Sequence, residues 1–393
     1  KKWTNMIRTC SPLPPHGLFF RRRSPFSIPE TFDSANDFRR QQHRAVHLGQ
    51  SSVRLLSEER PLDPAATGAD SRAEMAASIL SDWFEQKKNV LVLTGAGLST
   101  ESGISDYRGH KGGYYTGHVP MVHEQFMSSS RMRKRYWGRG MIGWREFSRS
   151  KPNAGHLALT ALERGGRIGV KLQRTEDHDS NPSTKQSKTG SEQISIITQN
   201  VDALHSRAGT LHVTELHGRN DRLTCMECGH QHCRHEFHDN LEDINKEMFA
   251  EILDHIAGAD DSRNLPDGDG ELEAEAMYDD IVVPPCPSCG KGFLKPDVVF
   301  FGDNVPKSRV DRCFAAVEAS DGLLCVGSSL AVYSAYRFVR AAAAADIPIA
   351  ILNVGLTRAE LSKLNVLKVE AAAGDTLRLL ARDLVPSLCI EEK

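Results

Sequence analysis

The stretch that decides the fold is residues 90–99, Val-Leu-Val-Leu-Thr-Gly-Ala-Gly-Leu-Ser. Its first four residues form a short apolar run that predicts a buried strand, and Thr94-Gly95-Ala96-Gly97-Leu98-Ser99 follows at once. A glycine-rich turn from a strand into a helix lets backbone N–H groups approach a pyrophosphate at the positive end of that helix. The next glycine is Gly103, so the spacing is not GxGxxG, and taken alone the motif is a weak signal for a nucleotide.

Similar apolar runs recur along the chain. They occupy residues 194–197, 323–326, 347–352 and 366–369, and helical patterns occupy residues 76–84, 310–319 and 333–345. Apolar strands that alternate with helices predict a parallel sheet covered on both faces. The expected fold class is therefore α/β, with a Rossmann-like parallel sheet.

Small and polar residues follow several of these predicted strands. The clusters are Gln199-Asn200-Val201-Asp202, Gly327-Ser328-Ser329 and Asn353-Val354-Gly355. Ligands of parallel sheets bind beyond the carboxyl ends of the strands, so the clusters together favour one nucleotide site. The alternative is that each cluster is a tight turn that packs a helix on the sheet. His217 lies between Glu215-Leu216 and Gly218 after a short alternating strand; a single histidine beside a glycine is more often structural.

Two cysteine pairs give the strongest signal. Cys225-x-x-Cys228 and Cys286-x-x-Cys289 are each followed by a glycine, and four cysteines so spaced predict a tetrahedral zinc site. Redox-active or unliganded thiols are the alternatives. Four thiolates leave no open coordination position, so this zinc is expected to be structural. Nearby polar residues, expected to form a solvated surface, are His230, His232, Cys233, His235 and His238.

The composition excludes several protein classes. Hydrophobic residues make up 39% of the 393 residues, charged residues 25%, and the formal net charge is −2. This balance disfavours a basic nucleic-acid binder, and no apolar run has the roughly 18 residues of a membrane span. We therefore expect neither nucleic acid nor membrane as a partner.

The first 29 residues contain no Asp or Glu, and Lys1, Lys2, Arg8, Arg21, Arg22 and Arg23 give them a charge of +6. An Arg-rich, acid-poor leader is typical of an organelle transit peptide, which indicates the mitochondrial matrix. A disordered extension is the alternative. In either case residues 1–70 lack a core-forming pattern and are expected to lie outside the fold.

Taken in order, the motifs resemble the sirtuin family over residues 73–384. Those that carry the resemblance are GAGLS at 95–99, GISDYR at 103–108, QNVD at 199–202, His217-Gly218, both CxxC pairs, FGD at 301–303, GSSL at 327–330 and NVG at 353–355. RYW at 135–137, KPDVVFFGD at 295–303 and SSLAVYS at 328–334 resemble the class II, mitochondrial branch. Ser105 stands where the family usually has proline, and this difference is expected to loosen the cofactor loop.

The resemblance implies a division of residues 71–393 and a set of ligands. A large Rossmann-like part takes residues 71–111, 156–218 and 297–393, a helical excursion takes residues 112–155, and a zinc module takes residues 219–296. NAD and an acylated protein lysine are expected to meet in the cleft between them.

The resemblance also implies roles for single residues. His217 is the expected general base and Asn200 the second catalytic residue. NAD is expected to contact Gly95, Ala96, Gly97, Ser99, Asp106, Tyr107, Arg108, Tyr115, Gln199, Asn200, Val201, Asp202, Gly327, Ser328, Ser329, Asn353, Val354, Gly355 and Ala373. The peptide backbone is expected to add as a strand between Phe301-Gly302 and Val332-Tyr333.

Tyr136 and Arg139 are expected to recognise the acyl group. They stand at i and i+3, so a helix projects both from one face. A similar Tyr-x-x-Arg pair in the family's acidic-acyl branch contacts the acyl carboxylate. The alternative places Tyr136 in the core and Arg139 in solvent.

The implied activity is NAD-dependent protein-lysine deacylation, in which the acyl group passes to ADP-ribose and nicotinamide is released. Two alternatives remain at this stage: protein mono-ADP-ribosyl transfer from the same site, and a catalytically weak NAD-binding sensor.

Overall fold

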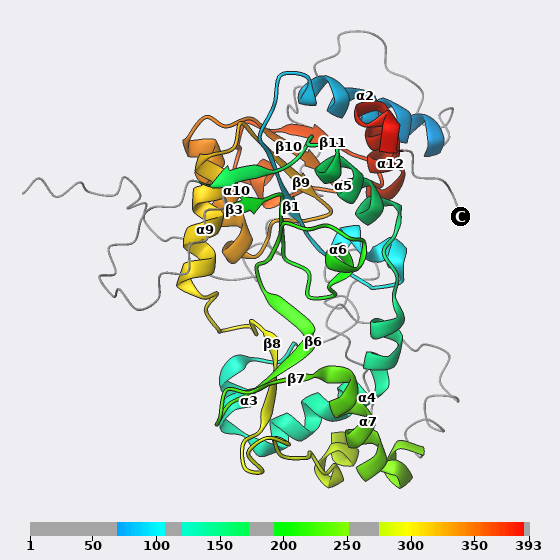
Figure 1. Cartoon of the computed structure of the whole chain (residues 1–393), viewed down its shortest axis with the longest axis vertical. Coiled ribbons are helices and arrows are strands. Elements are labelled where there is room, and N and C mark those ends of the chain that lie inside the picture. The colour runs from blue at the N-terminus through cyan, green and yellow to red at the C-terminus, as the bar shows by residue number, and fades with distance from the viewer. Residues whose placement is uncertain (1–68, 107–119, 173–191, 251–274, 389–393) are drawn as a thin grey trace, which may run out of the picture. The chain divides into compact units, whose positions relative to one another are not determined.

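The computed structural model describes residues 69–106, 120–172, 192–250 and 275–388 (Figure 1). Within these ranges the main feature is a six-stranded sheet in the order β11-β10-β9-β1-β4-β5. Every neighbouring pair in it is parallel. The strands are β1 (Val90–Thr94), β4 (Ile196–Thr198), β5 (Val213–Glu215), β9 (Gly322–Val326), β10 (Ile349–Leu352) and β11 (Leu367–Val369). The predicted parallel sheet is confirmed.

Helices cover both faces of this sheet. Residues on one face of β1, Val90 and Val92, share a core with α2 (Ala69–Phe84), α5 (Ala154–Arg164) and α12 (Ala373–Leu384). Leu91 and Leu93 point to the other face, where α9 (Lys307–Glu318) and α10 (Tyr333–Ala344) supply the partners. Because both faces are buried, the strands are continuous apolar runs rather than alternating ones.

One predicted strand is in fact two. The apolar run 194–197 divides at Ser195, which is fully buried. β3 (Glu192–Ile194) pairs antiparallel with β2 (Val170–Leu172), while β4 joins the parallel sheet. The apolar pattern is the same on both sides of Ser195, so it does not reveal the change of partner.

A second sheet belongs to the cysteine-bearing part of the chain. Its strands are β6 (Gly218–Cys225), β7 (Gln231–Cys233) and β8 (Leu294–Val298), antiparallel in the order β7-β6-β8. Helices α3 (His123–Ser128), α4 (Ser130–Arg149) and α7 (Arg234–Ile244) gather around it (Figure 1). Apolar residues of α3 and α4 share one core with those of β6, β8 and α7. The helices of the expected excursion are therefore packed on this small sheet, and we call the whole assembly the small module.

The glycine-rich turn after β1 does not open an α-helix. It forms two short 3-10 turns, η1 (Ala96–Leu98) and η2 (Thr100–Ser102), which end at Gly103 with φ +81°. The expectation that this turn leads into a helix with its positive end at the ligand is therefore wrong for the described residues. The remaining short elements are α6 (Leu204–Arg207), α11 (Arg358–Leu361), η5 (Glu275–Asp280) and η6 (Pro386–Leu388).

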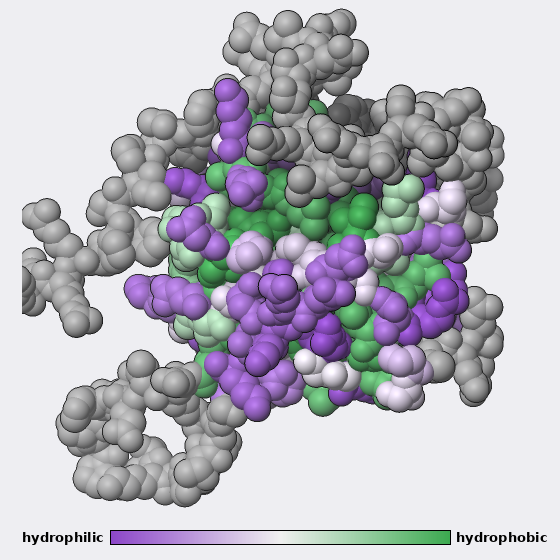
Figure 2. Space-filling model, turned by 90° about the horizontal axis from the view of Figure 1, so that it is seen from above, coloured by the Kyte–Doolittle hydropathy of each residue, from purple (hydrophilic) through white to green (hydrophobic). Residues whose placement is uncertain are grey.

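The surface drawn in Figure 2 carries both polar and apolar residues, with bands of polar and charged residues between patches of apolar ones. Among the residues that the structure describes, no helix has the length and apolar character needed to cross a membrane.

Candidate active site and metal centre

The loops after β1 and β9 lie directly against each other. Gly95 N donates to Val326 O at 3.0 Å, and Gly97 N donates to Gly327 O at 2.8 Å. A Cβ added at Gly95 would lie 2.7 Å from Ser328 Cβ, closer than such atoms come in real structures. The glycines at 95 and 97 are therefore needed for the contact between the two loops, whatever ligand binds there.

Side chains that follow β4 join these loops. The Gln199 amide donates from Nε2 to Ser328 Oγ at 2.8 Å. Asn200 is almost fully buried, and its Nδ2 donates to Ser99 Oγ at 3.0 Å and to Gly95 O at 3.1 Å. Three of the clusters that follow predicted strands are thus brought together at one edge of the sheet.

Asp202 extends this group. Its carboxylate accepts from Ser99 Oγ at 2.6 Å and from Leu204 N at 2.8 Å. Burial raises the pKa of Asp202, and the Ser99 and Leu204 hydrogen bonds and the Arg207 charge partly oppose that rise. A half-buried carboxylate that still has acceptor capacity is suited to receive an N–H from a ligand.

His217 connects the two sheets, since it stands between β5 and β6 and is half-buried. Its Nδ1 lies 3.0 Å from Gln199 O, and its Nε2 lies 2.7 Å from Ser334 Oγ. Burial lowers the pKa of His217 to about 4; the Gln199 hydrogen bond raises it, and the Arg337 and Arg309 charges lower it. The imidazole is therefore neutral near pH 7 and has a lone pair to accept a proton.

The tautomer of His217 follows from its partners. A backbone carbonyl can only accept, so Nδ1 must carry the hydrogen that Gln199 O receives. Nε2 is then the basic nitrogen, and the Ser334 hydroxyl donates to it.

Other predicted nucleotide residues lie on neighbouring loops. Asn353 follows β10 and donates from Nδ2 to Val354 O at 2.8 Å, while Gly355 N donates to a carboxylate oxygen of Glu370 at 3.2 Å. Ser329 O accepts from Arg358 N at 2.9 Å. Ala373 is the first residue of α12.

The half-buried Asp106 is the last described residue before a gap, and Val201 packs beside Leu204. Tyr107, Arg108 and Tyr115 lie outside the described residues.

Two contacts near these loops were not predicted. Glu101 accepts at Oε1 from Gly374 N, at 3.0 Å, and so connects the loop after β1 to the start of α12. Ser334 contacts His217 although 117 positions separate them in the sequence. Nothing in a serine within a helical pattern indicates that its helix begins beside a distant histidine.

The two residue pairs predicted to hold the peptide backbone are exposed at their aromatic members. Phe301 is 40% exposed and Tyr333 is 47% exposed. Val122 forms an isolated parallel bridge with Phe301, and His123 N donates to Phe301 O at 2.9 Å. Gly302 has a φ of +81°, and Val332 precedes the first turn of α10. One backbone side of Phe301 is therefore already paired within the chain.

Tyr136 and Arg139 lie on α4, which confirms that their segment is helical, and both are buried in the small module. Tyr136 packs edge-on against Phe126 and Phe300, and Arg234 Nη1 donates to its hydroxyl at 3.5 Å. Tyr136 is part of the core, as the alternative expects, but Arg139 is 1% exposed and is not the solvated surface charge of that alternative.

The four predicted zinc ligands lie together. Their sulfur atoms are all within 4.8 Å of one another, with Cys225–Cys289 at 3.8 Å and Cys228–Cys286 at 3.9 Å. Zinc–sulfur bonds of about 2.3 Å in a tetrahedron place the sulfurs about 3.8 Å apart, so the donor set fits a zinc ion.

Contrary to expectation, one of the nearby histidines is buried and another is half-buried. His238 is buried on α7, where its ring packs on Trp137 and Trp144. His232 is half-buried, and its Nε2 lies 3.3 Å from Cys286 Sγ. His230, Cys233 and His235 are exposed as expected.

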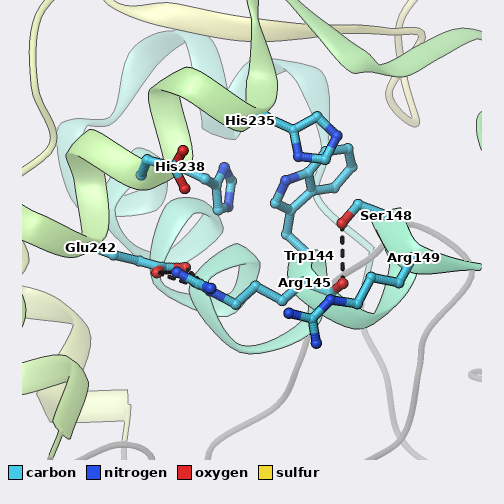
Figure 3. A pocket seen from close by; sticks show the side chains of 8 residues that line it. Trp144, Arg145, Ser148, Arg149, His235, His238 and Glu242 are labelled. Atoms are coloured by element: carbon cyan, nitrogen blue, oxygen red, sulfur yellow. Dashed lines mark hydrogen bonds and ion pairs between the residues drawn. The ribbon is translucent and has the colours of Figure 1, made fainter.

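A pocket of about 190 Å³ opens between α4 and α7 (Figure 3). In it His235 and His238 face Trp144, and Arg145 pairs with Glu242. Its lining residues are Trp144, Arg145, Ser148, Arg149, His235, His238, Asp239 and Glu242. The residues brought together after β1, β4 and β9 form what we call the strand-end cluster: Gly95, Ser99, Gln199, Asn200, Asp202 and Ser328. None of the pocket's lining residues is a predicted site residue, so this pocket is separate from the strand-end cluster.

Known proteins resemble the chain over most of its length. The family model described as Sir2 family matches residues 95–180 and 170–334. An NAD-dependent protein deacetylase of Xanthomonas axonopodis pv. citri (strain 306) is 42% identical over 301 residues, which make up 77% of this chain and 89% of that protein. The NAD-dependent protein deacylase Sirt4 of Drosophila melanogaster is 41% identical over 300 residues, covering 76% of this chain and 84% of that protein.

A solved structure described as "Structural Basis for the Mechanism and Regulation of Sir2 Enzymes" superposes with a TM-score of 0.53 and 27% identity. It covers 81% of this chain and 98% of its own. The parallel sheet, the four-cysteine cluster and these matches agree with one another, and this chain belongs to the Sir2 family.

Proposed function

We propose that this chain is an NAD-dependent protein-lysine deacylase. The observation that carries the proposal is the state of His217: it is neutral, its Nδ1 is bonded to Gln199 O in the strand-end cluster, which fixes the tautomer, and its basic Nε2 faces the hydroxyl of Ser334. The relatives named deacetylase or deacylase support the same activity.

The strand-end cluster fits NAD in its chemistry. A dinucleotide presents sugar hydroxyls, phosphates and a carboxamide, and it needs both donors and acceptors from the protein. Gln199 and Asn200 offer amides, Ser328 a hydroxyl and Asp202 a carboxylate, all at the carboxyl edge of a parallel sheet. When bound, NAD supplies a glycosidic carbon that becomes electrophilic as nicotinamide leaves.

Each residue then has a defined task. Asp202 accepts an N–H from the carboxamide, Gln199 and Asn200 orient the adjoining ribose, and Ser328, Ser329 and Asn353 hold the adenosine side. His217 takes a proton from a ribose hydroxyl, which prepares that oxygen for the acyl group. A positioned base contributes about 10²- to 10⁴-fold to a rate.

Mono-ADP-ribosyl transfer uses the same site but a different acceptor, and the relatives named deacetylase or deacylase do not favour it. A single assay separates the alternatives: the protein is incubated with NAD and a panel of acyl-lysine peptides, and the products are identified by mass. O-acyl-ADP-ribose is the expected product. Label from NAD that stays on protein, or binding without nicotinamide release, would contradict the proposal.

We propose that the four-cysteine cluster holds a structural zinc ion and that His232 supports it from outside. The Nε2 atom of His232 lies 3.3 Å from Cys286 Sγ, within reach for an N–H donated to a metal-bound thiolate. Four sulfur ligands fill the tetrahedron, so the ion stabilises the small module and takes no part in the reaction.

We propose that residues 1–70 direct the protein to the mitochondrial matrix, on the strength of their arginines and the absence of acidic residues up to residue 29. Residues 1–68 lie outside the described residues. A fluorescent protein fused behind residues 1–70 should enter mitochondria, and a deletion variant should keep its kinetic constants. A fusion that stays in the cytosol would contradict the proposed location without touching the proposed activity.

A further inference from the structure

The hydroxyl group of Ser334 is hydrogen-bonded to Nε2, the basic nitrogen of His217. Ser334 is the second residue of α10 and is half-buried, and its Oγ lies 2.7 Å from His217 Nε2. Because Gln199 O fixes the hydrogen on Nδ1, the proton of this hydrogen bond belongs to Ser334. Any group that delivers a proton to Nε2 must therefore displace this hydroxyl or pass the proton through it.

The Ser334 hydroxyl group is well suited to passing a proton on to His217. It has one donor and two acceptor positions, so while it donates to Nε2 it can still accept from another hydroxyl. It can also turn round after the transfer and accept from the imidazolium. A carboxylate at this position would favour only the charged ring, and an ammonium group only the neutral one.

An arginine donates to the backbone next to each partner of this hydrogen bond. Arg337 Nε donates to Ser334 O at 2.9 Å, at the start of α10. Arg309 Nη1 donates to Leu216 O at 3.1 Å, in the residue before His217. The first bond lies within α10 and supports its first turn, whereas the second joins α9 to the segment that carries His217.

We propose that Ser334 is a proton relay in the deacylase reaction: a ribose hydroxyl of the bound nucleotide donates to Ser334 Oγ, and Ser334 passes its own proton to His217 Nε2. The ribose O–H bond breaks and leaves its electron pair on the ribose oxygen, which becomes the nucleophile. A new Oγ–H bond replaces the one that breaks, and an Nε2–H bond forms, so the positive charge ends on the imidazole. This inference rests on the proposed function.

The test compares Ser334→Ala, which removes the relay, with Ser334→Thr, which keeps a hydroxyl. Under single turnover, acyl transfer by Ser334→Ala should be at least tenfold slower, and Ser334→Thr should recover most of the rate. Exchange of labelled nicotinamide into NAD reports glycosidic cleavage, which precedes the proton transfer, and it should stay within threefold of the original protein. Ser320→Ala, which removes a buried hydroxyl bonded to Val317 O at 2.7 Å, is the matched control.

Two further readouts separate a relay from a structural role. In mixtures of H₂O and D₂O, the single-turnover rate should depend on the deuterium fraction with a curvature that indicates two protons in flight, and Ser334→Ala should make it linear. The ¹⁵N signals of His217 should show hydrogen on Nδ1 in both proteins, because Gln199 still holds it.

Three results would overturn the relay: a loss below tenfold in Ser334→Ala, a Ser334→Thr variant as slow as Ser334→Ala, or loss of the Nδ1–H tautomer in Ser334→Ala. An unaltered protein that makes no O-acyl-ADP-ribose would instead overturn the proposed function. The histidine signals can be recorded without any substrate, so the two failures are distinguishable.

Discussion

The Ser99 hydroxyl and the Asp202 carboxylate are 2.6 Å apart, although one lies in the loop after β1 and the other in the loop after β4. The same hydroxyl accepts from Asn200 Nδ2 at 3.0 Å. Ser99 therefore connects the buried amide of Asn200 to the carboxylate of Asp202 through two hydrogen bonds. The arrangement keeps Asp202 in place while burial makes its charged form costly.

This cost leads to a prediction for Asp202→Asn. The folded pKa of Asp202 is raised, so its contribution to stability is present at low pH and is lost as the pH rises through the folded value. The free energy of unfolding of the original protein should therefore fall relative to that of Asp202→Asn between about pH 4.5 and about pH 7.5. The variant should also bind NAD about tenfold more weakly, because a charge-assisted acceptor is lost.

Denaturant unfolding at the two pH values and calorimetric titration with NAD measure these effects. Asp239→Asn is the matched control, since Asp239 is exposed on α7 in the small module. A difference in unfolding free energy that does not change with pH would contradict the sign of the pKa shift.

His217 should remain a competent base at unusually low pH. Its pKa is lowered to about 4, so it stays neutral as the pH falls past the ordinary histidine value near 6.5. The value of kcat/KM should show no acid-side loss from this group between about pH 8 and about pH 6. Because an unfolded chain binds the proton more readily, stability should decline as the pH drops from about 6.5 towards 4.

The matched variants are His217→Ala and His212→Ala, the second altering the histidine that precedes β5. The first should lose acyl transfer by about 10²- to 10⁴-fold and keep nicotinamide exchange, whereas the second should keep both activities. A kcat/KM profile with its acid limb centred near 6.5 would contradict the predicted state of His217.

Much of this site could be predicted because a residue at the end of a strand can be located from the apolar run that precedes it. A buried parallel strand is a short apolar run, and Gln199, Asn200 and Ser328 each follow one. Parallel strands end at the same edge, so the clusters after β1, β4 and β9 had to meet. The CxxC pairs are equally local, since each short turn sets two thiolates towards one metal.

The rest depends on tertiary contacts that leave no local signal. The chain after β1 forms 3-10 turns because Gly95 and Gly97 bond to the β9 loop instead of opening a helix. His238 was expected on a solvated surface, but it lies on α7, where its ring packs against Trp137 and Trp144. The pairing of Ser334 with His217 requires the whole sheet to be in place.

The cysteine cluster should be essential for the small module. Cys286→Ala removes one of four ligands whose sulfurs all lie within 4.8 Å, and metal binding and folding are coupled. The variant should lose zinc, as measured by elemental analysis, and its small module should unfold. Cys233→Ala alters an exposed cysteine at the end of β7 that is not part of the cluster, so it should keep one zinc per chain. A folded, zinc-bearing Cys286→Ala protein that lost only activity would point to a catalytic metal.

Arg139 provides the test of acyl selectivity. It is 1% exposed on α4, one turn from Tyr136, so a carboxylate that reached its guanidinium would be desolvated and held by a fork of donors. Such a bond is worth roughly 1.5–3 kcal/mol, or about 10- to 100-fold in kcat/KM. Arg139→Ala should therefore slow turnover of glutaryl- or hydroxymethylglutaryl-lysine peptides by that factor, with a much smaller effect on an acetyl-lysine peptide. Because the substitution also empties buried space, Arg139→Lys is needed beside it: it keeps the charge and most of the volume but not the fork, so it should recover only part of the acidic-acyl rate. Equal losses on both peptides in both variants would show that Arg139 supports the packing of the small module and does not read the acyl group.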